Sequence, residues 1–405
     1  MSGFPTRISY AAALAIVREV AGSRQPESER IAIRRVDGRI LAQDLVAPIA
    51  SPAFDNSRMD GFALRHADLD PTGDTSLRIA AAQFAGPALD LAMQPCECVR
   101  ITTGAPIPRN ADTVVIKENV REHEGRITVP AGVQAGADIR LAGEDVQAGD
   151  KVLEAGSLLS PARISLAAAL GVADLAVSKR PTVAVFTTGD ELVEPGLPLA
   201  PGQVFNSNRE LLMGLLRAEG LEPVAWPTLP DDPARIETAL RDAASAFDLV
   251  ITCGGVSAGE RDHLPALLAE LGEIHFWKVK MKPGMPLLFG EMDRALFLGL
   301  PGNPVSVLAT FLTLGHALLD GLQGRVEPRA RRFAKLAAPW SKSHERLEYL
   351  RGHLEYGADA VLRVLPNPAD ASHRLRGAAE SDALIVLAEQ SHEYAADDIV
   401  EIIAY

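Results

Sequence analysis

The chain has 405 residues, of which 47% are apolar and 23% charged, and this composition excludes a disordered or fibrous protein. The length is enough for about three domains. The formal net charge of −13 argues against broad binding to nucleic acid or to an anionic membrane, because both partners require a basic face.

The three cysteines, Cys96, Cys98 and Cys253, form no Cys-x-x-Cys pair. They therefore indicate neither a disulfide framework nor a zinc site, and reduced thiols fit a cytoplasmic protein. The sequence has no signal-peptide pattern and no apolar run near the ~20 residues of a membrane span. We expect a cytoplasmic protein with no membrane partner.

A discontinuous connector domain is predicted at the start of the chain. Its two segments are residues 1–45 and 149–180. Ser9 is a candidate N-cap for a helix over 8–21, because apolar residues follow it at helical spacing. A second helix is predicted to begin at Ser160-Pro161 and to end before Gly171.

Residues 46–148 are rich in glycine, proline and short β-like runs, which predicts a small β domain. The strand candidates are 99–102, 113–117 and 126–129. Three polar loops interrupt this pattern, and three such loops in one small domain favour a binding site. They lie at 55–61, 100–108 and 143–145. Taken alone, the composition of the first loop favours an Asx-type turn that caps its own backbone.

Residues 181–325 alternate apolar strands with amphipathic helices, which predicts an α/β domain with a mostly parallel sheet. Strands are expected near 183–187, 222–228, 248–252, 274–279 and 295–299, and helices near 207–219, 232–245, 261–271 and 304–319. Ligands of such sheets bind beyond the carboxyl ends of the strands. We therefore expect four loops to meet at one edge of the sheet. These loops are 187–191, 229–233, 253–262 and 300–304.

The loop 253–262 contains Gly254, Gly255 and Gly259. The backbone N–H groups of such a loop, together with a helix N-terminus, can bind an anion, and phosphate is the expected ligand. A simple strand-to-helix turn explains the glycines equally well. The neighbouring loops add like-charged carboxylates, which are costly to bring together unless a cation shares the site, and hydrated Mg²⁺ is the expected cation. These carboxylates are Asp190, Glu191, Asp231 and Asp262.

Lysines alternate over residues 276–284, which predicts that Lys278, Lys280 and Lys282 share one face of a strand. A solvated edge strand explains this row, but its place beside the glycine loop favours neutralisation of a phosphate. From residue 326 to 405 helical patterns disappear, and β-like runs predict a small C-terminal β domain. Arg351 and Ser372 are its notable polar residues.

Seven strings of residues, in this order along the chain, resemble the molybdopterin molybdenumtransferase family of the MoeA and gephyrin E-domain type. They are DNSRMDG at 55–61, RITTGAPIP at 100–108, GEDVQAGD at 143–150, TTGDEL at 187–192, CGGVSAGERD at 253–262, KMKPG at 280–284 and GLPGNPVS at 299–306. The resemblance covers nearly the whole chain. It implies a multidomain subunit with a MogA/MoaB-like α/β domain and a C-terminal domain like a β-barrel.

The resemblance also implies a homodimer, with the active cleft between the α/β domain of one subunit and the small β domain of the other. Family members insert molybdate into adenylylated molybdopterin, cleave the phosphoanhydride and release AMP with the help of Mg²⁺. The implied partner proteins are the molybdopterin adenylyltransferase and other proteins of the cofactor pathway. Nucleic acid and membranes are not expected partners.

Matching the family's motifs to this sequence assigns three groups of site residues. The catalytic positions are Asp60, Asp145, Glu191, Lys278 and Lys282. The metal ligands are Asp231 and Asp262. The substrate-binding positions are Thr103, Asp190, Gly254, Gly255, Ser257, Gly259, Pro301, Gly302, Asn303, Pro304, Arg351 and Ser372. Met285 departs from the pattern, because many relatives carry a basic residue after Lys-Pro-Gly, and this puts one phosphate or molybdate contact in doubt.

Two other functions fit parts of the sequence. The α/β domain alone also resembles the enzyme of the preceding step, which adenylylates molybdopterin with ATP, although the small β domain and DNSRMDG favour molybdenum insertion. A non-catalytic scaffold, as gephyrin is at synapses, is the second alternative. Against it, the acidic loops are kept and no second module is fused to the chain. The sequence does not distinguish molybdate from tungstate as the substrate.

Overall fold

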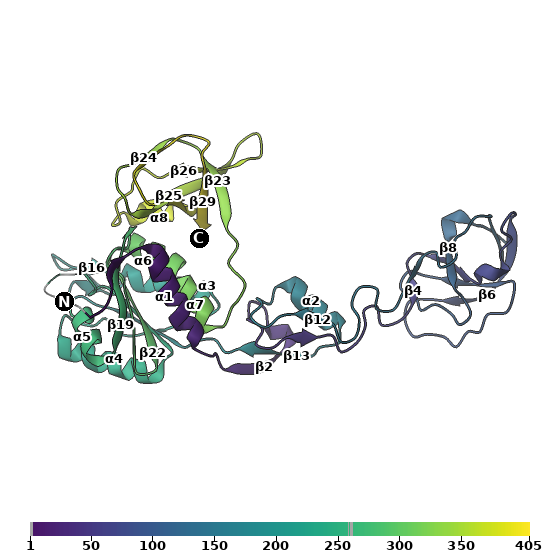
Figure 1. The fold of residues 1–405 in the computed structure, drawn as a ribbon, viewed down its shortest axis with the longest axis horizontal. Helices are drawn as coiled ribbons and strands as arrows, with labels where there is room; N and C mark the ends of the chain where they lie inside the picture. Colours follow the sequence, from purple (N-terminus) through teal and green to yellow (C-terminus); the bar gives the residue numbers. More distant parts are fainter. Residues whose placement is uncertain (1–2, 258, 260–261) are drawn as a thin grey trace. The chain divides into compact units, whose positions relative to one another are not determined.

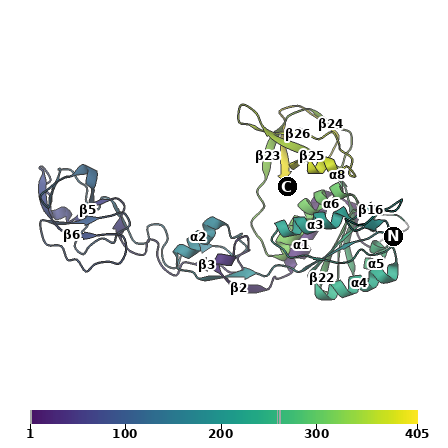
Figure 2. The ribbon, with the colours of Figure 1, turned by 180° about the vertical axis from the view of Figure 1, so that it is seen from behind.

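The computed structural model describes residues 3–257, 259 and 262–405. The chain forms two compact units, which Figures 1 and 2 show from opposite sides. Unit 1 consists of Met1–Glu29, Gly156–Leu158 and Val177–Tyr405, and unit 2 consists of Arg30–Ala155 and Leu159–Ala176. The four finer domain boundaries drawn from the sequence stay a prediction.

Unit 1 is built on a seven-stranded sheet with the strand order β1-β19-β21-β22-β18-β14-β17. The strands are β1 (Thr6–Ile8), β14 (Val183–Thr187), β17 (Val224–Ala225), β18 (Leu249–Cys253), β19 (Glu273–Val279), β21 (Leu288–Met292) and β22 (Ala295–Leu300). β21 runs antiparallel to both of its neighbours, while the other pairs are parallel. The predicted α/β fold is confirmed, but the sheet is mixed and includes β1 and β21, which the sequence patterns did not predict.

Helices cover both faces of this sheet, as Figures 1 and 2 show. One face carries α1 (Tyr10–Ser23), α3 (Ser207–Ala218), α6 (Pro304–Thr310) and α7 (His316–Leu322), and the other carries α4 (Pro233–Ala246) and α5 (Leu264–Leu271). Successive residues of a strand point to opposite faces. Accordingly, Val183 and Val185 enter one core, while Ala184 and Phe186 enter the other.

The helices begin and end largely where the sequence predicts. The Ser9 hydroxyl accepts a hydrogen bond from the N–H of Ala12 and caps α1. Ser160 caps α2 (Pro161–Ala169), and Gly171 after its end has a left-handed φ of 78°. Helix α5 begins three residues later than predicted.

The predicted helix 304–319 extends to Leu322 as one 19-residue rod. A π-helical segment, η4 (Phe311–Gly315), separates α6 from α7 within it. The rod is long and apolar enough to cross a membrane, but 78% of the tested stretch is buried inside the protein. It is therefore the core helix between the sheet and α1.

The C-terminal part of unit 1 is a closed barrel. Its strands are β23 (Arg332–Leu336), β25 (Leu347–Tyr356), β26 (Leu362–Pro366), β27 (Ala383–Leu387) and β29 (Ile399–Ala404). The ring closes because β25 pairs with both β26 and β27, while β29 joins β27 to β23 and β23 pairs with β26. The predicted β domain is confirmed. The expected absence of helices after residue 326 is wrong, since α8 (Leu375–Ala379) lies between two barrel strands.

Unit 2 contains a six-stranded sheet with the order β8-β5-β7-β6-β10-β9. The strands are β5 (Gly61–Leu64), β6 (Thr75–Gln83), β7 (Glu97–Ile101), β8 (Thr113–Ile116), β9 (Arg121–His123) and β10 (Arg126–Val129). Gly61, the last residue of DNSRMDG, is required by close packing, because a Cβ there would lie 2.0 Å from the Val115 carbonyl oxygen. Short strand pairs and α2 form the remainder.

Those short pairs are β2 (Ser28–Ala32) with β13 (Asp174–Ser178), β3 (Leu45–Val46) with β12 (Lys151–Leu153), and β4 (Asn56–Ser57) with β11 (Ile139–Arg140). Strand β2 ends at Ala32. Residues Ile33–Arg35 form a 3₁₀ turn.

In unit 1, the segment that leads from α7 to the barrel is held by Arg329. Its guanidinium donates to both carboxylate oxygens of Glu219, at 3.0 and 2.6 Å, and to both of Asp320, at 2.9 and 2.8 Å. His316 Nε2 lies 3.1 Å from Glu219 Oε1. Burial by itself would raise the pKa of Glu219, but the hydrogen bonds from His316 and Arg329 hold that pKa well below its usual range.

Arg329→Met should destabilise unit 1 by roughly 1 to 3 kcal/mol, because two half-buried carboxylates lose their partner. Because the pKa of Glu219 is lower in the folded state than its unfolded value of about 4.3, the carboxylate stabilises the protein when the pH is above this unfolded pKa. The stabilisation is lost as the pH falls from the unfolded pKa through the folded-state pKa. The difference from the wild type should therefore be full at pH 7 and should shrink toward pH 3 in thermal unfolding.

Arg331→Met is the matched control, because its pair with Glu401 is more exposed and should contribute much less to stability than the Arg329 network. Equal losses of stability in the two variants at pH 7 would contradict the importance of the Arg329 network.

Candidate functional site

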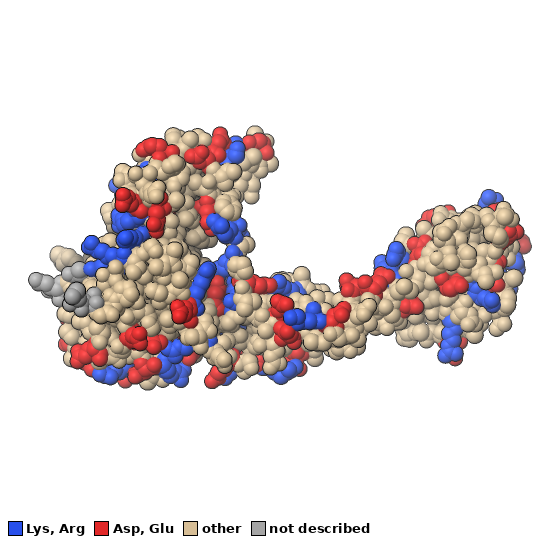
Figure 3. Space-filling view, viewed as in Figure 1, with Lys and Arg blue, Asp and Glu red and all other residues tan. Residues whose placement is uncertain are grey.

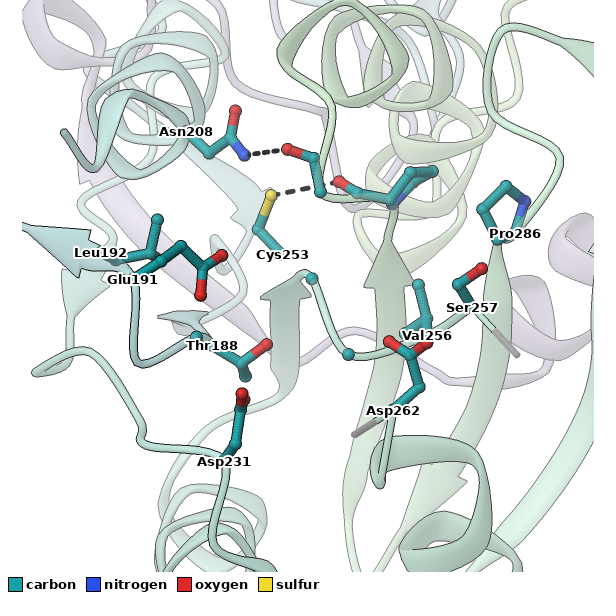
Figure 4. A pocket seen from close by; sticks show the side chains of 15 residues that line it. Thr188, Glu191, Leu192, Asn208, Asp231, Cys253, Val256, Ser257, Asp262 and Pro286 are labelled. Carbon is teal, nitrogen blue, oxygen red and sulfur yellow. Dashed lines mark hydrogen bonds between the residues drawn. The ribbon is translucent and has the colours of Figure 1, made fainter. Parts of the chain in front are cut away.

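Four loops at the carboxyl edge of the central sheet surround a cavity of about 260 Å³ in unit 1 (Figure 4). They follow β14, β17, β18 and β22, as the topology predicted. The lining residues are Thr188, Gly189, Glu191, Leu192, Asn208, Asp231, Cys253, Gly254, Gly255, Val256, Ser257, Asp262, Pro286, Pro301 and Gly302. Residues more than 100 positions apart in the sequence thus share one cavity.

Backbone hydrogen bonds fasten these loops to one another. The N–H of Gly254 donates to the Leu300 carbonyl at 3.0 Å, and the N–H of Thr188 donates to the Cys253 carbonyl at 3.1 Å. The N–H of Gly189 donates to the Leu229 carbonyl at 3.1 Å. The walls of the cavity are therefore positioned by the sheet itself.

Left-handed backbone shapes the loop after β18. Gly254 has a φ of 94° and Gly255 a φ of 69°, conformations that glycine adopts without strain. A Cβ at Gly254 would also lie 3.0 Å from the Thr188 carbonyl oxygen. A side chain at this position would therefore be both strained and tightly packed against Thr188.

The remaining predicted loop residues differ in position. Ser257 lines the cavity, whereas Gly259 does not. The N–H of Gly259 instead donates to Asp262 Oδ2 at 2.7 Å and so orients that carboxylate. Ala258, Glu260 and Arg261 of the CGGVSAGERD string lie outside the described residues.

Three of the four predicted loop carboxylates line the cavity: Glu191, Asp231 and Asp262. In Figure 4, Glu191 and Asp231 lie on one side and Asp262 on the other. The fourth, Asp190, does not line it, because its Oδ1 accepts a hydrogen bond from the N–H of Asp231 at 3.2 Å.

Within the described ranges, no three acidic, histidine or cysteine side chains are grouped closely enough to hold a metal by themselves. This donor set fits Mg²⁺, which keeps several water ligands and is typically bound by one or two carboxylates together with substrate phosphates.

The predicted row of lysines on one strand face is wrong. Strand β19 ends at Val279, and Lys278 has a left-handed φ of 69°, so the alternation of side chains breaks there. The Nζ of Lys278 lies 4.0 Å from the centre of the Trp277 ring. Lys282 belongs to β20 (Met281–Lys282), which pairs with barrel strand β25, and Lys280 is exposed.

Lys282 and the predicted barrel residues lie outside the cavity lining, around the segment 370–372. The Nζ of Lys282 is 2.8 Å from Glu348 and 3.4 Å from Asp370. Nη1 of Arg351 donates to the Ala371 carbonyl at 3.2 Å, and Nη2 of this buried side chain has no partner in the described part of the protein.

Ser372 connects this segment to the loop that carries Pro301 and Gly302. Its hydroxyl oxygen accepts a hydrogen bond from Asn303 Nδ2 at 3.0 Å, and its carbonyl accepts a weaker one from the Val305 N–H. Asn303 and Pro304 do not line the cavity but stand at the start of α6. The barrel residues therefore touch the site through one loop.

Unit 2 carries the other predicted site residues, Asp60, Thr103 and Asp145. Oδ1 of Asp60 accepts hydrogen bonds from the N–H and the hydroxyl of Thr103, both at 2.9 Å, and Oδ2 lies 3.7 Å from the Nζ of Lys117. The Thr103 backbone and side-chain hydrogen bonds lower the pKa of Asp60, and Lys117 adds to this. Asp60 is thus an ionised carboxylate at neutral pH. Asp145 is exposed, and its N–H donates to the Ser51 carbonyl at 3.2 Å.

Three residues near these sites were missed by the sequence patterns: Asn208, Pro286 and Lys117. Asn208 Nδ2 donates to the Gly302 carbonyl at 2.6 Å, while its buried Oδ1 has no partner among the described residues. Figure 4 shows this amide directed at the loop after β22. Its position in the first turn of α3, two residues after the cap residue Asn206, suggested a helix start and gave no sign of a long-range contact.

Comparisons with known families cover almost the whole chain. Residues 8–171 match the MoeA N-terminal region (domain I and II), residues 184–321 match a probable molybdopterin binding domain, and residues 334–405 match the MoeA C-terminal region (domain IV). The three matches follow one another without overlap.

Individual relatives agree with this assignment. The chain is 38% identical over 379 residues to the molybdopterin molybdenumtransferase of Haemophilus influenzae, which covers 93% of each protein. It is 33% identical over 404 residues to the enzyme of the same name from Synechococcus elongatus, with 98% of this chain and 99% of that protein covered.

Among solved structures, the molybdopterin biosynthesis moeA protein from Pyrococcus horikoshii OT3 is similar, with a TM-score of 0.84 and 26% identity over 98% of this chain and 100% of that one. The full-length relatives confirm the resemblance that the seven sequence strings indicated. The chain belongs to the MoeA family of molybdopterin molybdenumtransferases.

Proposed function

We propose that this protein inserts molybdate into adenylylated molybdopterin, cleaves the phosphoanhydride and releases AMP. The observation that carries the proposal is the cavity at the sheet edge, where left-handed glycine backbone lies across from carboxylates. A phosphate bound by the glycine loop and a cation bound by the carboxylates are the two components that phosphoryl chemistry requires.

Mg²⁺ is the proposed cofactor, with Asp231 and Asp262 as its carboxylate ligands. When bound, it neutralises negative charge on the anhydride as the bond breaks. The backbone of Gly254 and Gly255, together with Ser257, holds the pterin phosphate. Glu191 lies across the cavity from Asp262 and is the proposed catalytic carboxylate of unit 1.

Asn208 belongs to this site as well, because it fixes the carbonyl of Gly302 and with it the Pro301-Gly302 loop. Pro301 and Gly302 line the cavity directly, and Asn303, Pro304 and Asp190 support the lining from behind.

Basic residues compensate the excess of negative charge where the substrate binds. Figure 3 shows Lys and Arg side chains gathered where the barrel meets the α/β layers, on the side where Figure 1 labels β16. Lys278, Lys282 and Arg351 are the proposed charge-neutralising residues. In this role Lys278 leaves the Trp277 ring and Lys282 leaves Glu348 to contact the substrate. Arg351 already has one guanidinium nitrogen without a partner among the described residues.

We further propose a cytoplasmic homodimer in which Asp60, Thr103 and Asp145 of a second subunit complete the site. The ionised Asp60, held by Thr103 beside Lys117, is suited to orient water or molybdate and not to donate a proton. The substrate comes from the molybdopterin adenylyltransferase, the proposed partner among the proteins of the pathway.

Asp262→Asn should reduce AMP release from adenylylated molybdopterin at least about 100-fold, because a metal ligand next to the anhydride is lost. Asp231→Asn should behave in the same way. The reduction is measured with purified protein in the presence of Mg²⁺ and molybdate.

Asp232→Ser is the matched control, since Asp232 neighbours Asp231 but caps α4 through the N–H of Ala234, and serine retains that cap. Its activity should stay within about twofold of the wild type. Unchanged AMP release by the Asp262 variant would refute its role as a metal ligand.

Gly255→Asp should abolish phosphate binding, because it places a carboxylate in left-handed backbone at the anion-binding loop, where a Cβ lies 3.1 Å from the Leu264 side chain. Gly202→Asp has the same charge change at a φ of 88° with open space around it, and should bind AMP normally. Calorimetric titration with AMP and Mg²⁺ compares the two variants, and equal affinities would refute the phosphate cradle.

Mixing inactive subunits tests the contribution of the second subunit. If Asp60 acts on the cavity of its partner, then dimers formed from Asp60→Ala and Asp262→Ala subunits contain one intact site, and random mixing restores about a quarter of the wild-type activity. The activity is measured as AMP release after the two variants are unfolded and refolded together. No recovery, with mixed dimers demonstrated by tagging, would mean that each site uses one chain.

A further inference from the structure

We propose that Trp277 is a positioning residue for the anion-binding loop, because its indole N–H fixes the Val256–Ser257 peptide so that the Ser257 N–H points into the cavity. The inference rests on the proposed function, since it concerns how the same cavity binds phosphate. Trp277 is not one of the lining residues and would act through the loop.

The contact that carries the proposal joins β19 to the loop after β18. Nε1 of Trp277 donates a hydrogen bond to the Val256 carbonyl at 2.8 Å. The Val256 side chain is buried in the hydrophobic core against which Trp277 packs, and a Cβ at Gly299 would come within 2.6 Å of its Cγ1. Both the side chain and the carbonyl of Val256 are therefore fixed in direction.

The geometry of the peptide bond converts this contact into an orientation. In a trans peptide the C=O of one residue and the N–H of the next point in opposite directions. Since the Val256 carbonyl is directed at Trp277, which does not line the cavity, the N–H of Ser257 is directed away from Trp277. Ser257 lines the cavity, and Figure 4 places it beside Val256 on the wall that also carries Asp262. This N–H is thus a preoriented donor for an anion.

Trp277 is held through its backbone and through its ring. Its backbone N–H donates to the Pro5 carbonyl at 3.0 Å, and it pairs with Thr6 of β1 across the parallel edge of the sheet. The ammonium of Lys278 lies 4.0 Å above its ring. The short strand β1 therefore contributes to the site by supporting the tryptophan.

A second tryptophan provides a matched control. Trp226 packs on Phe186 with ring centroids 5.0 Å apart, in the same hydrophobic core. Its Nε1 is buried and has no hydrogen-bond partner in the described part of the chain. A Trp→Phe change removes the N–H at both sites while keeping an aromatic ring, but it breaks a hydrogen bond only at Trp277.

The test compares Trp277→Phe with Trp226→Phe. Binding of inorganic pyrophosphate in the presence of Mg²⁺ is measured by calorimetry, and the KM for adenylylated molybdopterin is measured by AMP release. We expect Trp277→Phe to weaken pyrophosphate binding and raise KM by about 3- to 10-fold, the effect of one misdirected hydrogen bond, with kcat within about twofold. Trp226→Phe should match the wild type, and the two variants should have similar melting temperatures.

Lys278 must be separated from this effect, because phenylalanine is a weaker cation–π partner than tryptophan. Trp277→Phe should therefore weaken pyrophosphate binding by the same factor in a Lys278→Met background as in the wild-type background. Loss of the effect in that background would show that Trp277 acts through Lys278, and would overturn the proposal.

The remaining outcomes are also decisive. Wild-type affinity in Trp277→Phe, or a melting temperature lowered without any change in affinity, would make the hydrogen bond purely structural. Absence of pyrophosphate binding by the wild-type protein would refute the anion-binding role of the loop, and the proposal with it. If the wild type binds pyrophosphate and the Trp277 effect appears, but no AMP is released, the proposed function fails and the positioning role stands.

Discussion

The in-register pairing of β14, β18 and β22 is the constraint on which the site depends. Thr187 pairs with Cys253, and Cys253 pairs with Leu300, so three parallel strands end side by side. Their loops start at one level and are joined by the hydrogen bond from Gly254 to the Leu300 carbonyl. A Cβ at Gly254 would lie only 3.0 Å from the Thr188 carbonyl oxygen. The buried strands thus determine where the carboxylates and the glycine backbone meet.

The sequence predicted the elements that have strong local signals. The apolar runs of β14, β18 and β22 and the cap and stop of α2 were found because their patterns are complete within a few residues. β21 was not predicted, because apolar and polar residues do not alternate along Leu288–Met292 and no predicted helix ends just before it. The lysine row failed because the left-handed backbone of Lys278 has no signature in sequence. Asn208 was missed because its partner Gly302 is 94 positions away, a contact that only the fold creates.

An acidic protein that binds an anionic substrate must keep its positive charges available without exposing a basic surface. Here the cationic groups are paired or buried within the protein. Lys278 contacts the Trp277 ring, Lys282 lies between Glu348 and Asp370, and Arg351 is buried in the barrel. A phosphate must compete with a ring face at Lys278 and with the buried carboxylate of Glu348 at Lys282. The segment 370–372 connects Lys282 and Arg351 to the loop of Pro301 and Gly302 and so joins the barrel to the cavity wall.

The central claim is that molybdenum insertion and cleavage of the anhydride occur together in this cavity. The most direct measurement incubates the purified protein with adenylylated molybdopterin, molybdate and Mg²⁺ and quantifies AMP, ATP and molybdenum cofactor in the same sample. We expect equal amounts of AMP and molybdenum cofactor, formed without any ATP. A requirement for added ATP, or cofactor formation without release of AMP, would contradict the claim.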